Sequence, residues 1–224
     1  THAHMDHAGF IPRLCKLGFT GRVYCTSGTH DLLHILLPDS GYLQEEDARR
    51  ANTYGYSKHQ PAEPLYTQDD AEACLSRLVV HPFNKSFEIV SGISATFTRA
   101  GHIIGSGCVV LNLDGTTLTF SGDVGRPNDP IMKPPSLLAA TDYLVIESTY
   151  GDRRHPNENV SDTIAEVVND TAKKKGVIVV PSFAVGRAQH LLHLLAQLRK
   201  ADRIPNIPVY LDSPMSIDAT EIFT

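Results

Sequence analysis

The 224-residue sequence lacks the features that mark secreted, membrane-spanning or repeat proteins. Its four cysteines are widely spaced and form no C-x-x-C pair, which argues against both a disulfide framework and a zinc knuckle. We therefore expect reduced thiols in a cytoplasmic protein. No apolar run is long enough to cross a bilayer, so no membrane association is expected. Internal repeats and low-complexity tracts are also missing.

An excess of positive charge is lacking as well. The formal net charge is −5, which argues against a broad basic face for nucleic acid but leaves local basic spots open. Hydrophobic residues make up 42% of the chain, enough for a sizeable core in one large domain or in parts of two.

The stretch THAHMDH, residues 1–7, is rich in metal-binding side chains. With 11 histidines and 25 acidic residues in the chain, an H-x-H-x-acid-H pattern has odds of only about three in a thousand of arising by chance. Imidazole and carboxylate together suit zinc. His2 and His4 are two apart on an extended segment and can point the same way, whereas Asp6 and His7 follow a turn. Four such residues suit two metal ions better than one.

Two further candidate ligands follow predicted strands, where loops collect functional groups. His102 lies in RAGHIIGSG, and Asp123 lies in FSGDVG, where an aspartate could bridge two ions. Isolated histidines are expected to be ordinary surface or core residues: His30, His34, His81, His190 and His193.

Hydrophobic periodicity predicts helices and one short strand in the first third of the chain. The expected elements are a helix within 8–19 that ends at Gly18, a strand over 21–26, a helix from Thr29 to about Pro38, and a helix over 69–80. Residues 44–66 are polar and broken by Gly and Pro, and we expect an insertion there.

The pattern then becomes β-rich and later alternates between strand and helix. We expect strands within 87–102, 106–123 and 141–149, with a hairpin turn at Asp114-Gly115. A helix over Glu158–Lys174, a strand over 176–182, a helix over Arg187–Lys200 and a strand over 207–213 then form a β-α-β run. Such a run predicts a parallel sheet in a second unit.

Six motifs in order, THAHMDH, AGHIIGSG, SGDVG, ESTYGDR, PSFAVGRAQ and YLDSPMS, resemble the metallo-β-lactamase superfamily and, in detail, its β-CASP branch of nucleases. That branch contains the 3′-end mRNA cleavage factor and bacterial and archaeal β-CASP ribonucleases. The resemblance implies an α/β fold. Residues 1–151 would form a metallo-β-lactamase αββα sandwich with its N-terminal strands missing, and residues 152–224 the beginning of a parallel α/β β-CASP domain.

The resemblance also implies a two-zinc centre. His2, His4 and His102 would bind one zinc, Asp6 and His7 the second, and Asp123 would bridge them. A hydroxide between the metals would be the nucleophile, oriented by Asp6.

Other residues gain roles from the same resemblance. Glu147 would hold a ligating imidazole in its tautomer; the alternative interpretation is a polar residue that caps a buried strand. Ser182 and Arg187 lie before a predicted helix, where an anion could bind. The resemblance places the loop with Asp212 and Ser213 on the substrate cleft. Ordinary helix capping explains the PSFAVGRAQ residues equally well.

Some expected parts are missing from the sequence. The family's two late histidines, one for the second zinc site and one to protonate the leaving oxygen, would lie beyond Thr224. We therefore expect this chain to be a fragment with an incomplete second site that does not turn over substrate alone.

The resemblance implies a zinc-dependent ribonuclease, endonucleolytic or 5′-exonucleolytic, that hydrolyses single-stranded RNA. A homodimer is compatible with this expectation. Three alternatives remain open. They are a DNA-processing nuclease of the same branch, a non-catalytic RNA-binding subunit, and a small-molecule hydrolase such as a thioesterase or lactamase. The intact ligand residues argue against the second, and the β-α-β run disfavours the third.

Overall fold

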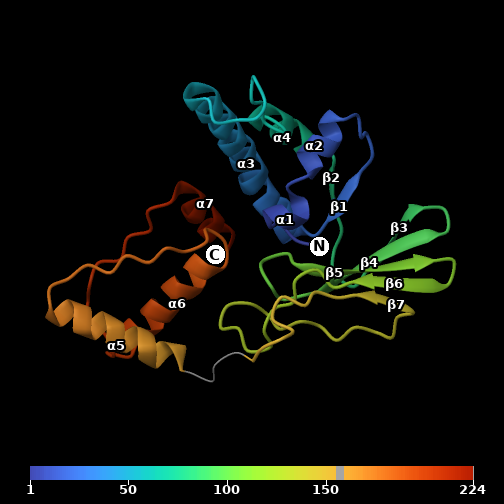
Figure 1. Ribbon diagram of the computed structural model, residues 1–224. Helices are drawn as coiled ribbons and strands as arrows, with labels where there is room; N and C mark the ends of the chain where they lie inside the picture. The colour runs from blue at the N-terminus through green and yellow to red at the C-terminus, as the bar shows by residue number, and fades with distance from the viewer. Residues whose placement is uncertain (155–158, 224) are drawn as a thin grey trace. The chain divides into compact units, whose positions relative to one another are not determined.

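The computed structural model describes residues 1–154 and 159–223 (Figure 1). The chain divides into two compact units, Thr1–Glu147 and Ser148–Thr224, which are described separately. Helices and mixed sheets confirm the α/β class. Within the described residues, no helix combines the length and the apolar character needed to cross a bilayer.

The first unit opens with a layer of four helices. These are α1 (Met5–Ala8), α2 (Ile11–Lys16), α3 (Ser27–Tyr54) and α4 (Gln68–Leu75). Figure 1 shows α3 and α4 side by side. The hydroxyl of Thr67 accepts a hydrogen bond from the backbone N–H of Asp70, and the Asp70 carboxylate accepts one from the Thr67 N–H, so a capping box begins α4.

Helix α3 differs from its predicted bounds. It is capped by Thr26 rather than begun by Thr29, and it continues past Pro38 to Tyr54. Proline removes one backbone donor and disfavours a helix interior. The buried side chains of α3 nevertheless extend beyond it to Ala51, and this packing keeps the helix intact. Much of the expected insertion at 44–66 is therefore helix.

Two sheets lie next to this helical layer. The parallel pair contains β1 (Val23–Cys25) and β2 (Leu78–Val80). The prediction of helix over 69–80 was thus wrong at its end, because Leu78–Val80, which contains two β-branched valines, pairs with β1. Tyr24 on β1 and His81 after β2 contact Phe87, so aromatic rings link the two sheets. His81, stacked on Phe87 with ring centroids 3.7 Å apart, has the structural role expected of it.

The larger sheet has the order β3-β4-β5-β6-β7. Its strands are β3 (Ser86–Val90), β4 (Ile93–Arg99), β5 (Gly107–Leu113), β6 (Thr116–Phe120) and β7 (Tyr143–Val145). Neighbours are antiparallel except for the parallel β6–β7 pair. The turn predicted at Asp114-Gly115 is confirmed, with φ values of 50° and 93°.

The second unit contains α5 (Val160–Lys173), α6 (Arg187–Lys200) and α7 (Pro214–Ile222). Helix α6 has the predicted bounds. The predicted start of α5 at Glu158 lies outside the described residues. A small core joins α5 and α6 and includes Ala165, Val168 and Leu198.

The two strands predicted for this unit are not formed. Residues 176–182 and 207–213 have no strand partner in the described part of the chain. Val177 and Val179 are 87% and 82% exposed. An apolar β-branched run favours extended backbone, but a parallel strand also needs a neighbour to complete its hydrogen bonds, and these segments have none here.

Candidate metal centre

The opening residues are held against the larger sheet. The carbonyl of Thr1 accepts a hydrogen bond from the backbone N–H of Gly107 at the start of β5, at 2.9 Å. His2 follows and is almost fully buried, and His4 precedes α1 with extended backbone. Both imidazoles lie on the same side, as the two-residue spacing predicts: His2 Nε2 and His4 Nδ1 are 3.1 Å apart.

His102 reaches the same point from the β4–β5 loop. The Ser106 hydroxyl accepts a hydrogen bond from the His102 backbone N–H at 2.8 Å. The Gly105 carbonyl accepts hydrogen bonds from the hydroxyls of Thr26 and Thr29, which ties the loop to the start of α3. His102 Nε2 then lies 3.2 Å from His4 Nδ1.

Asp123 completes the cluster from the loop after β6. Its Oδ2 lies 3.7 Å from His2 Nε2 and 3.5 Å from His102 Nε2. One ligand atom from each of four residues lies within 4.8 Å of the others: His2, His4, His102 and Asp123. His2 Nε2 and His102 Nε2 lie 3.1 and 3.2 Å from His4 Nδ1. These distances are close to the spacing of about 3.3 Å that two nitrogens have on one tetrahedral zinc. The donor set therefore fits a single metal ion.

His7 approaches the other oxygen of Asp123. Its Nε2 is 3.2 Å from Asp123 Oδ1 and 3.5 Å from Asp6 Oδ2. The Asp123 carboxylate thus faces His2 and His102 through one oxygen and His7 through the other. The Asp6 side chain is 77% exposed, so its carboxylate is open to solvent beside His7.

The environment keeps two imidazoles in the form that binds metal. Burial, and after it the neighbouring imidazoles, lowers the pKa of His2 from 6.5 to about 2. Burial, and after it the His102 ring, also lowers the pKa of His4. Both rings are therefore neutral near pH 7, as coordination requires.

Glu147 supports the loop that carries Asp123. Its Oε1 accepts a hydrogen bond from the backbone N–H of Val124 at 2.8 Å, and its own N–H donates to the Ser121 hydroxyl at 3.1 Å. These bonds fix the residues on both sides of Asp123. The prediction that Glu147 holds an imidazole is not tested by these contacts, which indicate a positioning role.

The residues predicted to contact substrate lie in the second unit. Ser182 and Arg187 flank the loop before α6, and Ser213 caps α7 by accepting from the Ser216 N–H, directly after the exposed Asp212.

The sequence analysis missed Gln189, which joins the loop before α6 to helix α7. Its Nε2 donates to the Ala184 carbonyl at 3.0 Å and to the Thr220 hydroxyl at 2.9 Å, and its Oε1 accepts from the Gly186 N–H. A glutamine three residues after the N-cap residue of a helix is the sequence signal that predicts the bond between Gln189 and the Gly186 N–H.

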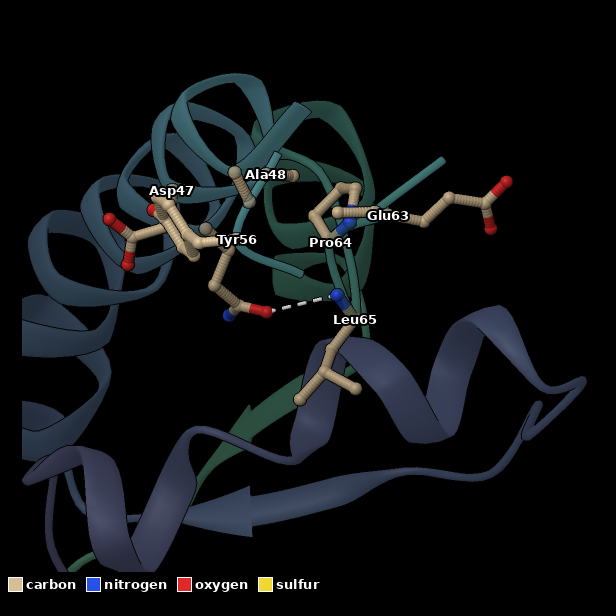
Figure 2. A pocket seen from close by; sticks show the side chains of 9 residues that line it. Asp47, Ala48, Tyr56, Glu63, Pro64 and Leu65 are labelled. Atoms are coloured by element: carbon tan, nitrogen blue, oxygen red, sulfur yellow. Dashed lines mark hydrogen bonds between the residues drawn. The ribbon is translucent and has the colours of Figure 1, made fainter. Parts of the chain in front are cut away.

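A shallow pocket of about 460 Å³ lies at the far end of α3 (Figure 2). Its lining includes Asp47, Tyr56, Glu63 and Leu65, and the Gln44 side chain accepts from the Leu65 N–H at 3.1 Å. This lining contains no imidazole or thiol, so the pocket lacks the nitrogen ligands of the cluster around His4. The candidate site remains the cluster around His4.

Comparison with known proteins agrees with this geometry. The family model of the metallo-beta-lactamase superfamily matches residues 1–175, and the Beta-Casp domain model matches residues 188–224. The chain therefore belongs to the metallo-β-lactamase superfamily, in its β-CASP branch. This family is metal-dependent.

Named relatives match between 96% and 100% of the chain. It is 34% identical over 217 residues to "Ribonuclease TTHA0252" of Thermus thermophilus, covering 96% of the chain and 46% of the relative. The chain is 34% identical over 230 residues to "Transcription termination factor FttA" of Methanocaldococcus jannaschii, and this match covers 100% of the chain and 34% of the relative. An "RNase J-like protein" of the same organism is 27% identical, and this match covers 100% of the chain and 48% of the relative. The chain thus spans less than half the length of these relatives.

Proposed function

We propose that this chain is the metal-binding part of a zinc-dependent ribonuclease that hydrolyses phosphodiester bonds of single-stranded RNA. The observation that carries the proposal is the convergence of three imidazole nitrogens and one carboxylate oxygen within 4.8 Å. The names of two relatives, a ribonuclease and an RNase J-like protein, support RNA as the substrate class. The domain boundary is proposed near residue 151, which the division after Glu147 supports.

The proposed ligand roles follow the geometry of the cluster. His2, His4 and His102 hold one ion, His7 and Asp6 face a second, and Asp123 lies between the two. Nitrogen and carboxylate ligands suit zinc, although related divalent ions share this preference. Bound ions would supply Lewis-acid polarisation of the phosphate and acidify a water molecule.

The protein's own residues orient the reacting groups. The exposed Asp6 carboxylate is available to accept a hydrogen bond from the attacking water, on the side of the site that His7 occupies. Glu147 keeps Asp123 in place through the Val124 backbone. Ser182, Arg187, Asp212 and Ser213 are proposed to contact the RNA strand. Location in the cytoplasm and a homodimer are part of the same proposal.

The test is cleavage of labelled single-stranded RNA and DNA of matched sequence, with and without chelator. It uses a polypeptide that contains residues 1–224 within the length of the relatives, because the chain covers only 46% of the Thermus protein. We expect RNA to be cut and chelator to abolish cutting. Preferential cutting of DNA would assign the chain to a DNA-processing enzyme, and metal-loaded protein that binds RNA without cutting it would overturn the enzymatic proposal.

Asp123→Asn separates a ligand role from a general loss of structure. Removal of a charge placed at the reaction centre is expected to lower the rate about a hundredfold or more. Asp114→Asn is the matched control, since Asp114 lies in an exposed turn with φ of 50°, a conformation that asparagine tolerates. Equal activity of the two variants would remove Asp123 from the centre.

A further inference from the structure

A second pair of histidines lies on α3, outside the cluster described above. His30 and His34 are four residues apart and therefore project from the same face of the helix. Their Nε2 atoms are 3.3 Å apart, and their ring centroids are 4.6 Å apart. The His30 side chain is 32% exposed, so solvent reaches the pair.

The separation of the two nitrogens suits a shared metal ion. Zinc binds imidazole nitrogen at about 2.0–2.1 Å with tetrahedral angles, which puts two such nitrogens about 3.3 Å apart. The observed Nε2–Nε2 distance of 3.3 Å matches this spacing. The rings are tilted by 52° rather than stacked.

A neighbouring carboxylate orients one of the rings. Asp31 Oδ1 lies 3.0 Å from His30 Nδ1, the nitrogen that faces away from His34. A metal-ligating histidine commonly donates its second ring N–H to a carboxylate, which fixes the tautomer and makes the ligating nitrogen more basic. With its Nδ1–H donated to Asp31, His30 has the Nε2 lone pair left to accept a hydrogen bond from His34 or to bind a metal ion.

We propose that His30 and His34 form a separate surface site for a borderline divalent cation such as Zn²⁺, Ni²⁺ or Cu²⁺, with Asp31 as the positioning residue. Within the described residues, the only cluster of three or more ligand groups is the one around His4. The surface site therefore offers two protein ligands, and water or a ligand from solution completes the coordination. It binds more weakly than the four-residue cluster, and Cu²⁺ binds it more tightly than Zn²⁺.

The test counts zinc ions per chain after equilibrium dialysis at rising Zn²⁺ concentration, by elemental analysis. We expect His34→Ala to lose one weakly bound ion while the tighter binding stays unchanged. His193→Ala is the matched control, since His193 is also on a helix and contacts a side chain four residues on, Gln197, at 2.8 Å. This variant is expected to bind as much zinc as the unchanged chain.

Asp31→Asn tests the positioning role with the fold and both imidazoles retained. We expect the weak site to lose about 10–100-fold in zinc affinity, as measured for other partners of ligating histidines. Unchanged zinc binding in His34→Ala, or equal loss in His193→Ala, would overturn the site and leave only the hydrogen bond between the two rings. Unchanged affinity in Asp31→Asn would overturn the role of Asp31. The proposal does not depend on ribonuclease activity.

Discussion

Gly105 connects the loop that carries His102 to the start of α3, and Gly105→Ala tests that connection. The residue has φ of +78°, and its carbonyl accepts hydrogen bonds from two threonine hydroxyls of α3 and its cap. A Cβ atom added at this position would lie 2.0 Å from the Thr29 backbone nitrogen. The backbone must therefore move if alanine is introduced.

The expected loss of stability has two parts. Left-handed backbone costs alanine about 1–2 kcal/mol relative to glycine, and the forced movement adds about 1–3 kcal/mol. The total for Gly105→Ala is about 2–5 kcal/mol. Gly115→Ala is the matched control, because Gly115 has φ of +93° but nothing within 4 Å of an added Cβ. It is expected to lose only the first part, about 1–2 kcal/mol.

Urea unfolding measures the difference directly. The free energy of unfolding should fall further in Gly105→Ala than in Gly115→Ala, with similar slopes. Zinc affinity should fall in Gly105→Ala alone, because the displaced loop carries His102. Equal destabilisation of the two variants, or unchanged zinc affinity in Gly105→Ala, would refute the argument that this contact sets the position of His102.

Further predictions concern the core and the thiols. Leu37→Ala should lower the free energy of unfolding by about 2–5 kcal/mol, because this side chain is fully buried, whereas Leu43→Ala on the same helix, 53% exposed, should change it by less than about 0.5 kcal/mol. Burial raises the pKa of the Cys74 thiol to about 12 and that of Cys25 to about 11, and it also raises the pKa of Cys108. A thiol reagent at pH 8 should therefore label at most one cysteine, Cys15, in the folded chain and all four in denaturant; rapid labelling of two or more would contradict the described packing.

The sequence predicted elements whose signals are local. The Asp114-Gly115 turn follows from two residues that accept positive φ, and α6 follows from helical periodicity between Gly186 and Lys200. The ligand candidates in residues 1–7 were identified because such side chains are rare at that density, and His102 and Asp123 because they follow predicted strands. The structure brings His2, His4, His102 and Asp123 together.

Features that depend on tertiary contacts could not be predicted this way. Helix α3 continues past Pro38 because its side chains pack against the rest of the unit. Leu78–Val80, predicted as helix, form a strand because they pair with β1. Conversely, residues 176–182 have a strand-like composition but no strand to pair with. The His30–His34 pair was also missed, because each histidine was considered alone rather than as two residues on one helix face.

The most direct test of the central claim is a competition titration of zinc against a chelator of known affinity, with the chain and its His102→Ala variant. We predict at least one tight zinc site in the chain. The variant should lose this tight binding, because only three of the four ligand groups remain. His59→Ala, which changes an exposed histidine outside both sites, should bind as the chain does. No tight site in the chain, or equal zinc affinity in His102→Ala, would contradict the account.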